Sequence, residues 1–491
     1  MPGVKALSKS RLLSYRQCPK RLYLETYRRD LIEITPAQQK IFDVGHDVSN
    51  LAQSFYPNGV LIKHDFELSK AIDDTKEHLS NSDISTLFEA TFKHNQVLIR
   101  ADLLHKTDTR FHIQEVKSST SVKDVNIEDC AIQAWVIEGS GYKIDEIELT
   151  HINNQFTYEV LGNYQGLFKH QSLINEVHDF EPIVEHWVKS AFEVISTKEE
   201  PSIQPGEQCT RPYDCPFIEY CDPIATEYPV ECLPYGTRTA IALKNEGITD
   251  IRDIPNGRLT SENHERIRRV TISGEYELEP AVKNVMSELS YPRYYIDFET
   301  IQFAIPRWLG TRPYQQIPFQ WSCHIENSPK ELDHVEYLDT SGNDPSRSFV
   351  ETLIHAVGDE GSILVYNAGF ENTRLKELAE RFPEHKDKIF NIIDRVVDLL
   401  PIAKKYYYHP AMKGSWSIKN VLPTIASELN YSELEGVHDG GGAQNVYIEA
   451  IESDTGEDRR NVIRNNLIEY CKLDTYAMVV IARFFEGVAL E

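Results

Sequence analysis

The sequence lacks several features that would assign it to a specialised class of protein. Its longest apolar runs, such as the one ending near Ile481, are far shorter than a membrane span. Its first residues lack the continuous apolar core of a signal peptide. It also has no low-complexity tract and no internal repeat, which argues against extended disorder and repeat architectures. We therefore expect a folded, cytoplasmic protein.

Positive charge is scarce over the whole chain but not at its beginning. The formal net charge is -25, and such a balance normally argues against a polyanionic partner. Residues 1–30, however, hold eight basic residues against two acidic ones, a local excess of six positive charges. An acidic protein can still bind nucleic acid if a basic groove leads to carboxylates that metal ions neutralise. Net charge therefore does not exclude a nucleic-acid partner.

The length of 491 residues predicts two or three domains rather than one core. A loop rich in Pro, Gly and Cys over 201–224 indicates the end of a first domain, and short helical pieces follow it. After Pro292, strand and helix patterns alternate, which is typical of an α/β sheet domain. We predict an α/β multidomain protein with boundaries at 1–225, 226–288 and 289–491.

The patterning of the first domain predicts helices around a hairpin. Leu and Tyr recur at helical spacing over 9–28, with an interruption near Cys18-Pro19. Two alternating segments joined by the polar turn KTDT predict a β-hairpin. The remaining predicted elements are helices over 38–55 and through 132–136, and a strand over 146–151. The hairpin strands themselves span 96–105 and 110–117.

Three charged residues of this hairpin form a pattern with chemical meaning. Glu115 and Lys117 are two apart on a strand and so face the same way, and Asp102 lies on the neighbouring strand. Two carboxylates can hold a divalent cation, while the ammonium can activate a water and stabilise the charge of a phosphate. In isolation, the same triplet also describes a solvated strand, so it needs context.

Four of the eight cysteines form a set with ligand-like spacing. Cys209, Cys215 and Cys221 follow the pattern C-x5-C-x5-C, and Cys18 lies in SYRQCPKRLYL far upstream. Four thiolates suit either a tetrahedral zinc or a 4Fe-4S cluster. Because zinc usually prefers a close C-x2-C pair, the wide spacing favours the cluster over zinc or simple burial of the thiols. The other four cysteines, expected to be core residues, are Cys130, Cys232, Cys323 and Cys471.

A second acidic set lies in the C-terminal third of the chain. Asp297 and Glu299 in RYYIDFETI are two apart on a predicted strand. Tyr470 and Asp474 are four apart on a helix predicted from about Arg460 to Phe485, so they share one face. Glu371 lies in LVYNAGFENTRL, near the joint between a strand and a helix. Together, four carboxylates and a phenol could hold two metal ions that clamp an attacking water and a leaving oxygen.

The first domain resembles the RecB-like branch of the PD-(D/E)xK nucleases over roughly its first 225 residues. The motifs SKSRLLSYRQCPKRLYL and D…EVK and a downstream glutamine occur in the family's order. The resemblance implies a restriction-endonuclease-like fold in which Asp102, Glu115 and the Val116 carbonyl bind metal. It also implies Lys117 as the catalytic lysine and Gln133 as a residue that helps place the substrate.

The same resemblance implies a role for the spaced cysteines, and it shows that one metal-binding histidine of the family is absent here. One N-terminal and three C-terminal cysteines recur in the iron–sulfur members, which implies a 4Fe-4S cluster held by Cys18, Cys209, Cys215 and Cys221. The family often has a histidine in a GxxVH motif, whereas Ser49 occupies that place here. His46, one turn earlier, is expected to be a surface or packing residue. The substitution leaves open whether the first site is active.

Residues 290–491 resemble the DEDDy class of RNase H-like 3′-to-5′ exonucleases, with DFET, NAGFE and Y-x3-D as motifs. The resemblance implies that Asp297, Glu299, Glu371 and Asp474 bind metal and that Tyr470 aligns the water. The family usually has Asp where Glu371 stands.

Asp398 is an alternative ligand that we expect to cap or pack locally. The whole chain also resembles a bacterial family in which both domains are fused. That resemblance would place Trp416, Ser417 and Lys419 near the substrate path.

The middle segment allows two interpretations. LPYGTRTAIALKNEGITDIRDIP has the rhythm of a helix, a Gly turn and a second helix, typical of a helix-hairpin-helix module that contacts phosphate. Alternatively it is a compact spacer in which Gly247 only ends a helix. The pattern does not choose between them.

The combined expectation is a nuclease that hydrolyses phosphodiesters of single-stranded or frayed DNA with Mg2+ or Mn2+ at two active sites. RNA remains an alternative substrate. One competing hypothesis keeps only the C-terminal exonuclease active and makes the first domain a nucleic-acid-binding module. Another is a non-catalytic nucleic-acid adaptor.

Overall fold

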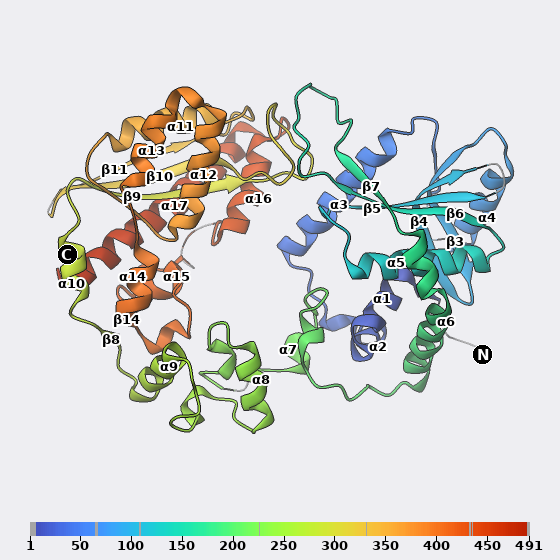
Figure 1. Cartoon of the computed structure of the whole chain (residues 1–491), viewed down its shortest axis with the longest axis horizontal. Coiled ribbons are helices and arrows are strands. Elements are labelled where there is room, and N and C mark those ends of the chain that lie inside the picture. Colours follow the sequence, from blue (N-terminus) through green and yellow to red (C-terminus); the bar gives the residue numbers. More distant parts are fainter. Residues whose placement is uncertain are drawn as a thin grey trace. The chain divides into compact units, whose positions relative to one another are not determined.

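The computed structural model of the chain describes residues 6–63, 67–107, 110–224, 226–329, 331–431, 434 and 436–488 (Figure 1). The chain forms two compact units, an α/β arrangement in each case. Unit 1 comprises 1–223 and 303–314, and unit 2 comprises 224–302 and 315–491. Among the described residues, no helix combines the length and the apolar character needed to cross a membrane.

Unit 1 is built on a mixed sheet in the order β2-β3-β4-β5-β6-β7, with β1 paired to β4. Its strands are β1 (Leu7–Ser8), β2 (Val60–Leu61), β3 (Thr86–His94), β4 (Val97–Lys106), β5 (Phe111–Lys117), β6 (Ile144–Ile152) and β7 (Phe168–Ser172). Its helices are α1 (Lys9–Gln17), α2 (Pro19–Tyr27), α3 (Pro36–Ser54), α4 (Leu68–Ser80), α5 (Asp124–Gly139), α6 (Ile174–Thr197) and α7 (Ile218–Cys221).

The predicted elements of the first domain are confirmed. The helix interruption is real, because Pro19 begins α2 and the Cys18 N–H still donates to the Ser14 carbonyl at the end of α1. Strands β4 and β5 pair antiparallel as the expected hairpin, although part of its turn lies outside the described residues. One face of the sheet packs on α4, α5 and α6, and the other on α3.

Unit 2 contains a five-stranded mixed sheet in the order β11-β10-β9-β12-β13. Strands β9, β10 and β11 are antiparallel, whereas β12 and β13 run parallel to β9. The strands are β8 (Glu277–Leu278), β9 (Arg293–Ile301), β10 (Ile317–Ser328), β11 (Glu331–Leu338), β12 (Ser362–Val365), β13 (Val396–Asp398) and β14 (Tyr407–Tyr408).

Unit 2 also contains a two-stranded sheet, β14-β8, and ten helices of at least four residues in the described part of the chain. They are α8 (Thr237–Asn245), α9 (Glu262–Ser273), α10 (Val282–Ser287), α11 (Ser346–Val357), α12 (Ala368–Arg381), α13 (Lys386–Asp394), α14 (Leu399–Tyr406), α15 (Ile418–Val421), α16 (Gly440–Ile451) and α17 (Glu457–Glu486). The predicted long C-terminal helix corresponds to α17.

Alternation along β9 explains how the sheet is covered. Tyr294, Ile296 and Phe298 pack with residues of α11, α12 and α13 on one face. Tyr295 points to the other face and packs with the apolar side of α17. Because side chains of a strand alternate, Asp297 and Glu299 also face α17. The sequence therefore directs the two carboxylates to a side of the sheet that a buried helix covers.

The connector segment is part of unit 2 in the structure. Its apolar residues share a core with α17 and with Tyr407 and Tyr408, and β8 pairs with β14. Gly247 has φ +82° and follows the end of α8. The residues after it form only a 3-10 turn, Ile251–Asp253, and the next α-helix is α9. The second helix therefore does not lie where the sequence pattern placed it.

Candidate active sites and cysteine site

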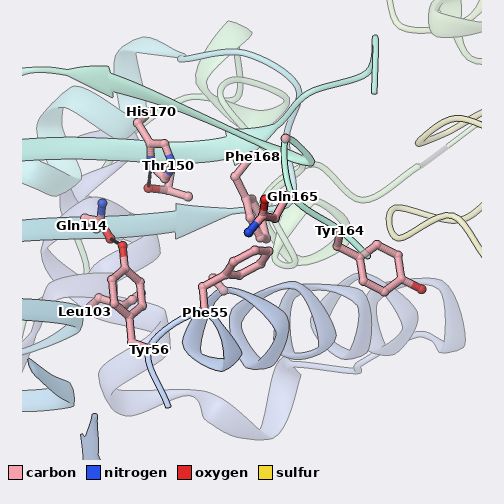
Figure 2. Close-up of a pocket in the computed structure, with 11 residues that line it drawn as sticks. Phe55, Tyr56, Leu103, Gln114, Thr150, Tyr164, Gln165, Phe168 and His170 are labelled. Atoms are coloured by element: carbon pink, nitrogen blue, oxygen red, sulfur yellow. Dashed lines mark hydrogen bonds between the residues drawn. The ribbon is translucent and has the colours of Figure 1, made fainter. Parts of the chain in front are cut away.

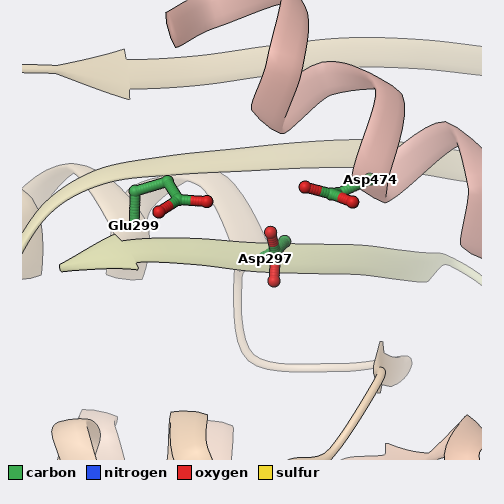
Figure 3. Close-up of side chains that lie close together, drawn as sticks. All are labelled: Asp297, Glu299 and Asp474. Carbon is green, nitrogen blue, oxygen red and sulfur yellow. The ribbon is translucent and has the colours of Figure 1, made fainter. Parts of the chain in front are cut away.

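Three carboxylates meet beside the sheet of unit 2. Asp297 and Glu299 project from β9 and Asp474 from α17, and their nearest oxygens lie within 4.8 Å of one another. Figure 3 shows the three side chains turned toward the same space between strand and helix. Glu299 and Asp474 are buried and Asp297 is half-buried. Within the described residues, this is the group of carboxylate, His and Cys side chains compact enough for one metal ion.

Glu371 is a fourth carboxylate whose charge influences this group of three. It lies in the first turn of α12 and is buried. Its Oε2 atom has no hydrogen-bond partner among the described residues. Its charge helps raise the pKa of Asp297, although it is outside the compact group of three. A buried carboxylate oxygen without a partner is costly, and a cation in the cluster would reduce that cost.

Burial shifts the pKa of every carboxyl in this cluster upward, and repulsion between the carboxylates adds to the shift at Asp297 and Glu299. Burial, followed by the charges of Asp474 and Glu299, raises the pKa of Asp297 well above its usual range. Burial and the Asp474 charge raise the pKa of Glu299 to about 8. Burial also raises the pKa of Glu371 to about 8. Lys419 lowers the pKa of Glu299 and of Asp474 but does not outweigh burial and repulsion at Glu299, which fits a divalent cation site.

Two phenols and one ammonium border Asp474. The Tyr431 hydroxyl donates to Asp474 Oδ1 at 2.6 Å, and the Lys419 Nζ donates to the Tyr470 hydroxyl at 3.1 Å. Lys419 Nζ also lies 5.1 and 5.0 Å from the ring centres of Tyr431 and Tyr470. Burial raises the pKa of Asp474, the Tyr431 hydrogen bond, the Lys419 charge and the Tyr470 hydrogen bond lower it, and the result is about 6.

The structure places Lys419 and Tyr470 at the site, as expected, and adds Tyr431. No motif in the sequence around Tyr431 marks it, since it lies in an irregular segment between α15 and α16. Ser417 ends the loop before α15, with its hydroxyl on Asn420. Trp416 is buried in the core, and its indole N–H donates to the Tyr407 carbonyl, so it packs rather than lining the cluster.

Asp398 stabilises local structure, as the sequence indicated. Its carboxylate accepts hydrogen bonds from the Asn367 and Ala368 N–H groups at 3.0 and 2.9 Å. It also accepts from the Leu400 N–H at 2.9 Å, which caps α14. These bonds hold the β12–α12 turn against the end of β13 and so position Glu371 on α12.

The acidic residues of unit 1 are already paired with ammonium groups. Lys117 Nζ lies 2.5 Å from Glu115 Oε1 and 2.8 Å from Asp129 Oδ2. Lys9 Nζ lies 2.9 Å from the same Glu115 oxygen and 2.8 Å from Asp129 Oδ1. The Gln133 side chain donates to the other Glu115 oxygen at 2.7 Å. Both oxygens of Glu115 are therefore engaged.

Asp102 lies beside this paired set and has a different environment. Its Oδ2 accepts from the Val116 N–H at 2.8 Å, and the Val116 side chain packs on the opposite face of the sheet. Burial and the Glu115 charge raise the pKa of Asp102 to about 8. By contrast, Lys117 and Lys9 hold the pKa of Asp129 below its usual range against the effect of burial.

Lys9 and Asp129 were not predicted as members of this site. Asp129 precedes Gln133 by one helical turn on α5, so its position on the same face could have been inferred. Lys9 begins α1 and reaches the sheet only through the tertiary fold, which leaves no local signal. His46 is exposed on α3, consistent with the surface role expected for it.

The basic residues near the N-terminus are largely paired within unit 1. Arg16 pairs with Glu128, Lys20 with Glu200 and Arg21 with Glu25, besides the contacts of Lys9. Lys5 lies outside the described residues. The local excess of positive charge seen in the sequence is therefore reduced by folding.

The four spaced cysteines line one cavity. Cys18 comes from the α1–α2 junction, Cys209 and Cys215 from the loop after α6, and Cys221 from α7, with Lys20 and Arg21 on the same wall. Cys130, Cys323 and Cys471 are buried as predicted, and Cys232 is partly buried against the core of unit 2.

Comparisons with known proteins find a sequence match largely within unit 2. Residues 294–417 match a family described as “Domain of unknown function (DUF2779)”. This match includes Asp297, Glu299 and Glu371 and ends before Asp474.

Curated relatives include proteins of Ureaplasma parvum and Mycoplasma genitalium. “Uncharacterized protein UU173” of Ureaplasma parvum serovar 3 is 28% identical over 183 residues, 33% of this chain and 26% of that protein. “Uncharacterized protein MG366” of Mycoplasma genitalium is 27% identical over 226 residues, 42% of this chain and 33% of that protein. The matched part thus spans a third or less of each relative. The chain is similar in part to these proteins and to the DUF2779 domain.

Proposed function

We propose that the chain is a divalent-metal-dependent nuclease whose active site is the carboxylate cluster of unit 2. One observation carries the proposal: Asp297, Glu299 and Asp474 converge within 4.8 Å although α17 and β9 are far apart in sequence. Burial and the neighbouring carboxylates raise the pKa values of Asp297 and Glu299, and the charge of Lys419 offsets this at Glu299 only in part. Hard carboxylate oxygens in such a group are the ligands that Mg2+ and Mn2+ prefer.

The topology around the cluster supports the RNase H-like resemblance. The acidic strand β9 is central in the order β11-β10-β9-β12-β13, with antiparallel strands on one side and parallel strands on the other. Glu371 enters from the turn that follows β12, and Asp474 from the C-terminal helix. The four proposed ligands therefore lie on β9, at the start of α12 and on α17, which are a strand, a strand–helix joint and a long helix, as the sequence motifs predicted.

The residues have separable roles in hydrolysis. Bound divalent ions would supply the positive charge that favours attack of water on a phosphodiester and departure of the oxygen. Asp297, Glu299 and Asp474 hold the ions, and Glu371 adds negative charge close to them. The Tyr470 hydroxyl, fixed by Lys419 at 3.1 Å, orients a water. Burial raises the pKa of Tyr470, so this phenol keeps its proton at neutral pH, and its oxygen can accept a hydrogen bond from the water.

Unit 1 is proposed to bind nucleic acid rather than to cut it. Glu115 already accepts hydrogen bonds from Lys9, Lys117 and Gln133, so a metal ion there would compete with two ammonium groups for its charge. The serine at position 49 removes a further ligand that the RecB-like family often supplies. Two working sites, the broader expectation from the sequence, would require this ion-pair set to open when metal binds.

The substrate proposed is single-stranded or frayed DNA, with RNA as the alternative. This follows from the resemblance of unit 2 to 3′-to-5′ exonucleases, which act at strand ends. Separate Lys117→Ala and Asp297→Ala proteins, tested on end-labelled DNA and RNA strands with Mn2+, provide the test. We expect Asp297→Ala to abolish cutting and Lys117→Ala to preserve it. Equal activity of both variants and the wild type would contradict the proposed site.

A 4Fe-4S cluster is proposed at the four cysteines of unit 1. The four cysteines line one cavity, and their spacing in the sequence contains no close C-x2-C pair, which favours a 4Fe-4S cluster over zinc. The ammonium of Lys20 and the guanidinium of Arg21 would offset the charge of four thiolates.

The cluster has a direct chemical test. Anaerobically purified protein should be brown and contain about four irons per chain. Cys221→Ala should lose the colour, whereas Cys232→Ala, which removes a cysteine outside the set, should keep it. A colourless protein with one zinc per chain would contradict the assignment.

A further inference from the structure

Unit 1 contains a pocket that the proposed chemistry does not use. Its volume is about 350 Å³, and it lies where α3 ends, over β4, β5 and β6 and beside β7. Figure 2 shows Phe55, Gln165 and Phe168 at one end and Tyr56 and Gln114 at the other.

The pocket is on the opposite side of the sheet from the ion pairs of unit 1. Leu103 and Gln114, two of its lining residues, are cross-strand neighbours. Both also lie next to a residue of the acidic site in the sequence. Asp102 directly precedes Leu103, and Glu115 directly follows Gln114. Neighbouring residues of a strand point to opposite faces, so the pocket and the ion-pair set are separate sites on the same two strands.

Aromatic rings form the walls of this pocket. Phe55 and Phe168 meet edge to face, with ring centres 5.9 Å apart and planes at 79°. Tyr164 stacks on Tyr158 at 4.8 Å with nearly parallel planes, and its hydroxyl donates to the Pro306 carbonyl. Phe55 is 40% exposed. An exposed aromatic ring at the mouth of a pocket offers a surface for stacking.

The polar groups of the pocket are held in fixed orientations. Gln114 accepts from the Tyr56 hydroxyl at 3.1 Å and donates to Glu148 at 3.0 Å. Thr150 and His170 are linked through Oγ1 and Nδ1 at 2.9 Å. The side chain of Gln165 is exposed at the mouth, where its amide presents one donor and one acceptor to a ligand.

The side chains that line the pocket restrict the charge of a ligand that would fit it. The lining residues include no Lys, Arg, Asp or Glu, so the pocket is built for a neutral group rather than for a phosphate. An acyl chain would gain little from Gln165, Thr150 and His170 at the rim. A planar ring with hydrogen-bonding edges fits both the aromatic walls and the amide.

We infer that this pocket binds a nucleobase, with the sugar and phosphate left outside in water. The inference deepens the proposed function, because it rests on unit 1 being the part that binds nucleic acid. The base could belong to a single strand or to a free nucleoside, since both present the same ring. For a strand, one base inserted here would anchor the chain while the cluster of unit 2 performs the cutting.

The test uses the full-length protein without added divalent metal, so that no strand is cut. The probes are 2-aminopurine within an eight-nucleotide DNA and, separately, 2-aminopurine riboside. Phe55→Ala and Gln165→Ala both change exposed side chains and should leave the fold intact. Phe42→Ala is the matched control, because Phe42 lies on the same helix, is 53% exposed and does not line the pocket.

We expect the DNA probe to bind with a change in its fluorescence. Phe55→Ala should weaken this binding about tenfold, the loss typical of one base–aromatic stack, and Gln165→Ala about threefold. Phe42→Ala should bind like the wild type. Binding of the riboside alone, with the same sensitivity to Phe55→Ala, would support the base pocket and identify a free nucleoside as its ligand.

Two outcomes separate this inference from the proposed function. If Phe55→Ala binds both probes as tightly as the wild type does, the pocket is not a base site, whatever the nuclease activity. If the wild-type protein with Mn2+ cuts no strand but binds the riboside through Phe55, the nuclease proposal fails and the base pocket remains supported.

Discussion

The two acidic clusters of this chain contain similar residues in opposite electrostatic surroundings. In unit 1, Glu115 and Asp129 contact two ammonium groups at 2.5 to 2.9 Å. In unit 2, the three carboxylates of the cluster lie near the ammonium of Lys419. That ammonium donates hydrogen bonds to the Tyr470 hydroxyl and the His438 carbonyl. The pKa of Asp129 is accordingly lowered, whereas that of Glu299 is raised to about 8.

This difference shows that residue type alone does not define a metal site. Buried carboxylates require positive charge, and a protein can supply it with lysines or leave it to a bound cation. In unit 1 two lysines supply this charge, and we propose that in unit 2 a bound cation does. The following experiments test that contrast, beginning with the largest expected effect.

The same substitution should have opposite effects on stability in the two clusters. Glu115→Gln leaves Lys9 and Lys117 without one of their two partners, and we expect it to lower the free energy of unfolding by about 3 kcal/mol. Glu299→Gln puts a neutral amide in place of a carboxyl whose ionisation is opposed by burial and by Asp474, so the metal-free protein should become more stable by about 1 kcal/mol. Urea unfolding at pH 7.5 measures both. A comparable loss in both variants would contradict the contrast.

Divalent metal should stabilise the protein through unit 2, and more strongly at high pH. Glu299 and Glu371 have pKa values raised to about 8, so protons favour the folded, metal-free state below that pH. Without metal, the stability contributed by these protonated carboxyls is lost as pH rises toward 8. Added Mn2+ then binds without competing protons. The rise in Tm caused by Mn2+ should be several degrees larger at pH 8 than at pH 6.

The control for this prediction is Asp297→Asn together with Glu299→Gln. This protein should show little Mn2+-dependent rise in Tm at either pH. A rise that is independent of pH, or that survives in the double variant, would assign the metal effect to another part of the chain.

Substitution of Tyr431 should have a smaller effect than the changes above, and it should be confined to the rate of cutting. Its hydroxyl donates to Asp474 at 2.6 Å, so Tyr431→Phe removes one hydrogen bond without emptying the core. We expect kcat to fall about three- to tenfold, with little change in KM. Tyr470→Phe should reduce kcat more strongly, because that phenol is proposed to orient the water. Rates from single-turnover assays distinguish the two, and equal effects would argue against separate roles.

Much of the fold could be predicted because its signals are local. The spacing of Asp297 and Glu299 along a strand, and of Tyr470 and Asp474 along a helix, already determines which side chains share a face. The helix break at Pro19 and the β4–β5 hairpin follow from local chemistry in the same way.

The parts that escaped prediction depend on contacts between distant segments. Residues 303–314 were expected in the C-terminal domain but belong to unit 1, where the Tyr158 N–H donates to the Thr311 carbonyl at 3.0 Å. Lys9 and Tyr431 join their sites only after folding. The connector shares the core of unit 2 with α17, and no local pattern distinguishes that packing from an independent module.

Binding of Mn2+ followed by electron paramagnetic resonance tests the central claim most directly, because it counts ions without requiring a substrate. The wild-type protein and Glu115→Gln should take up Mn2+ alike, and the Asp297→Asn, Glu299→Gln double variant should lose that binding. If the double variant retains full binding while Glu115→Gln loses it, the metal site lies in unit 1 and the proposed nuclease centre of unit 2 is wrong.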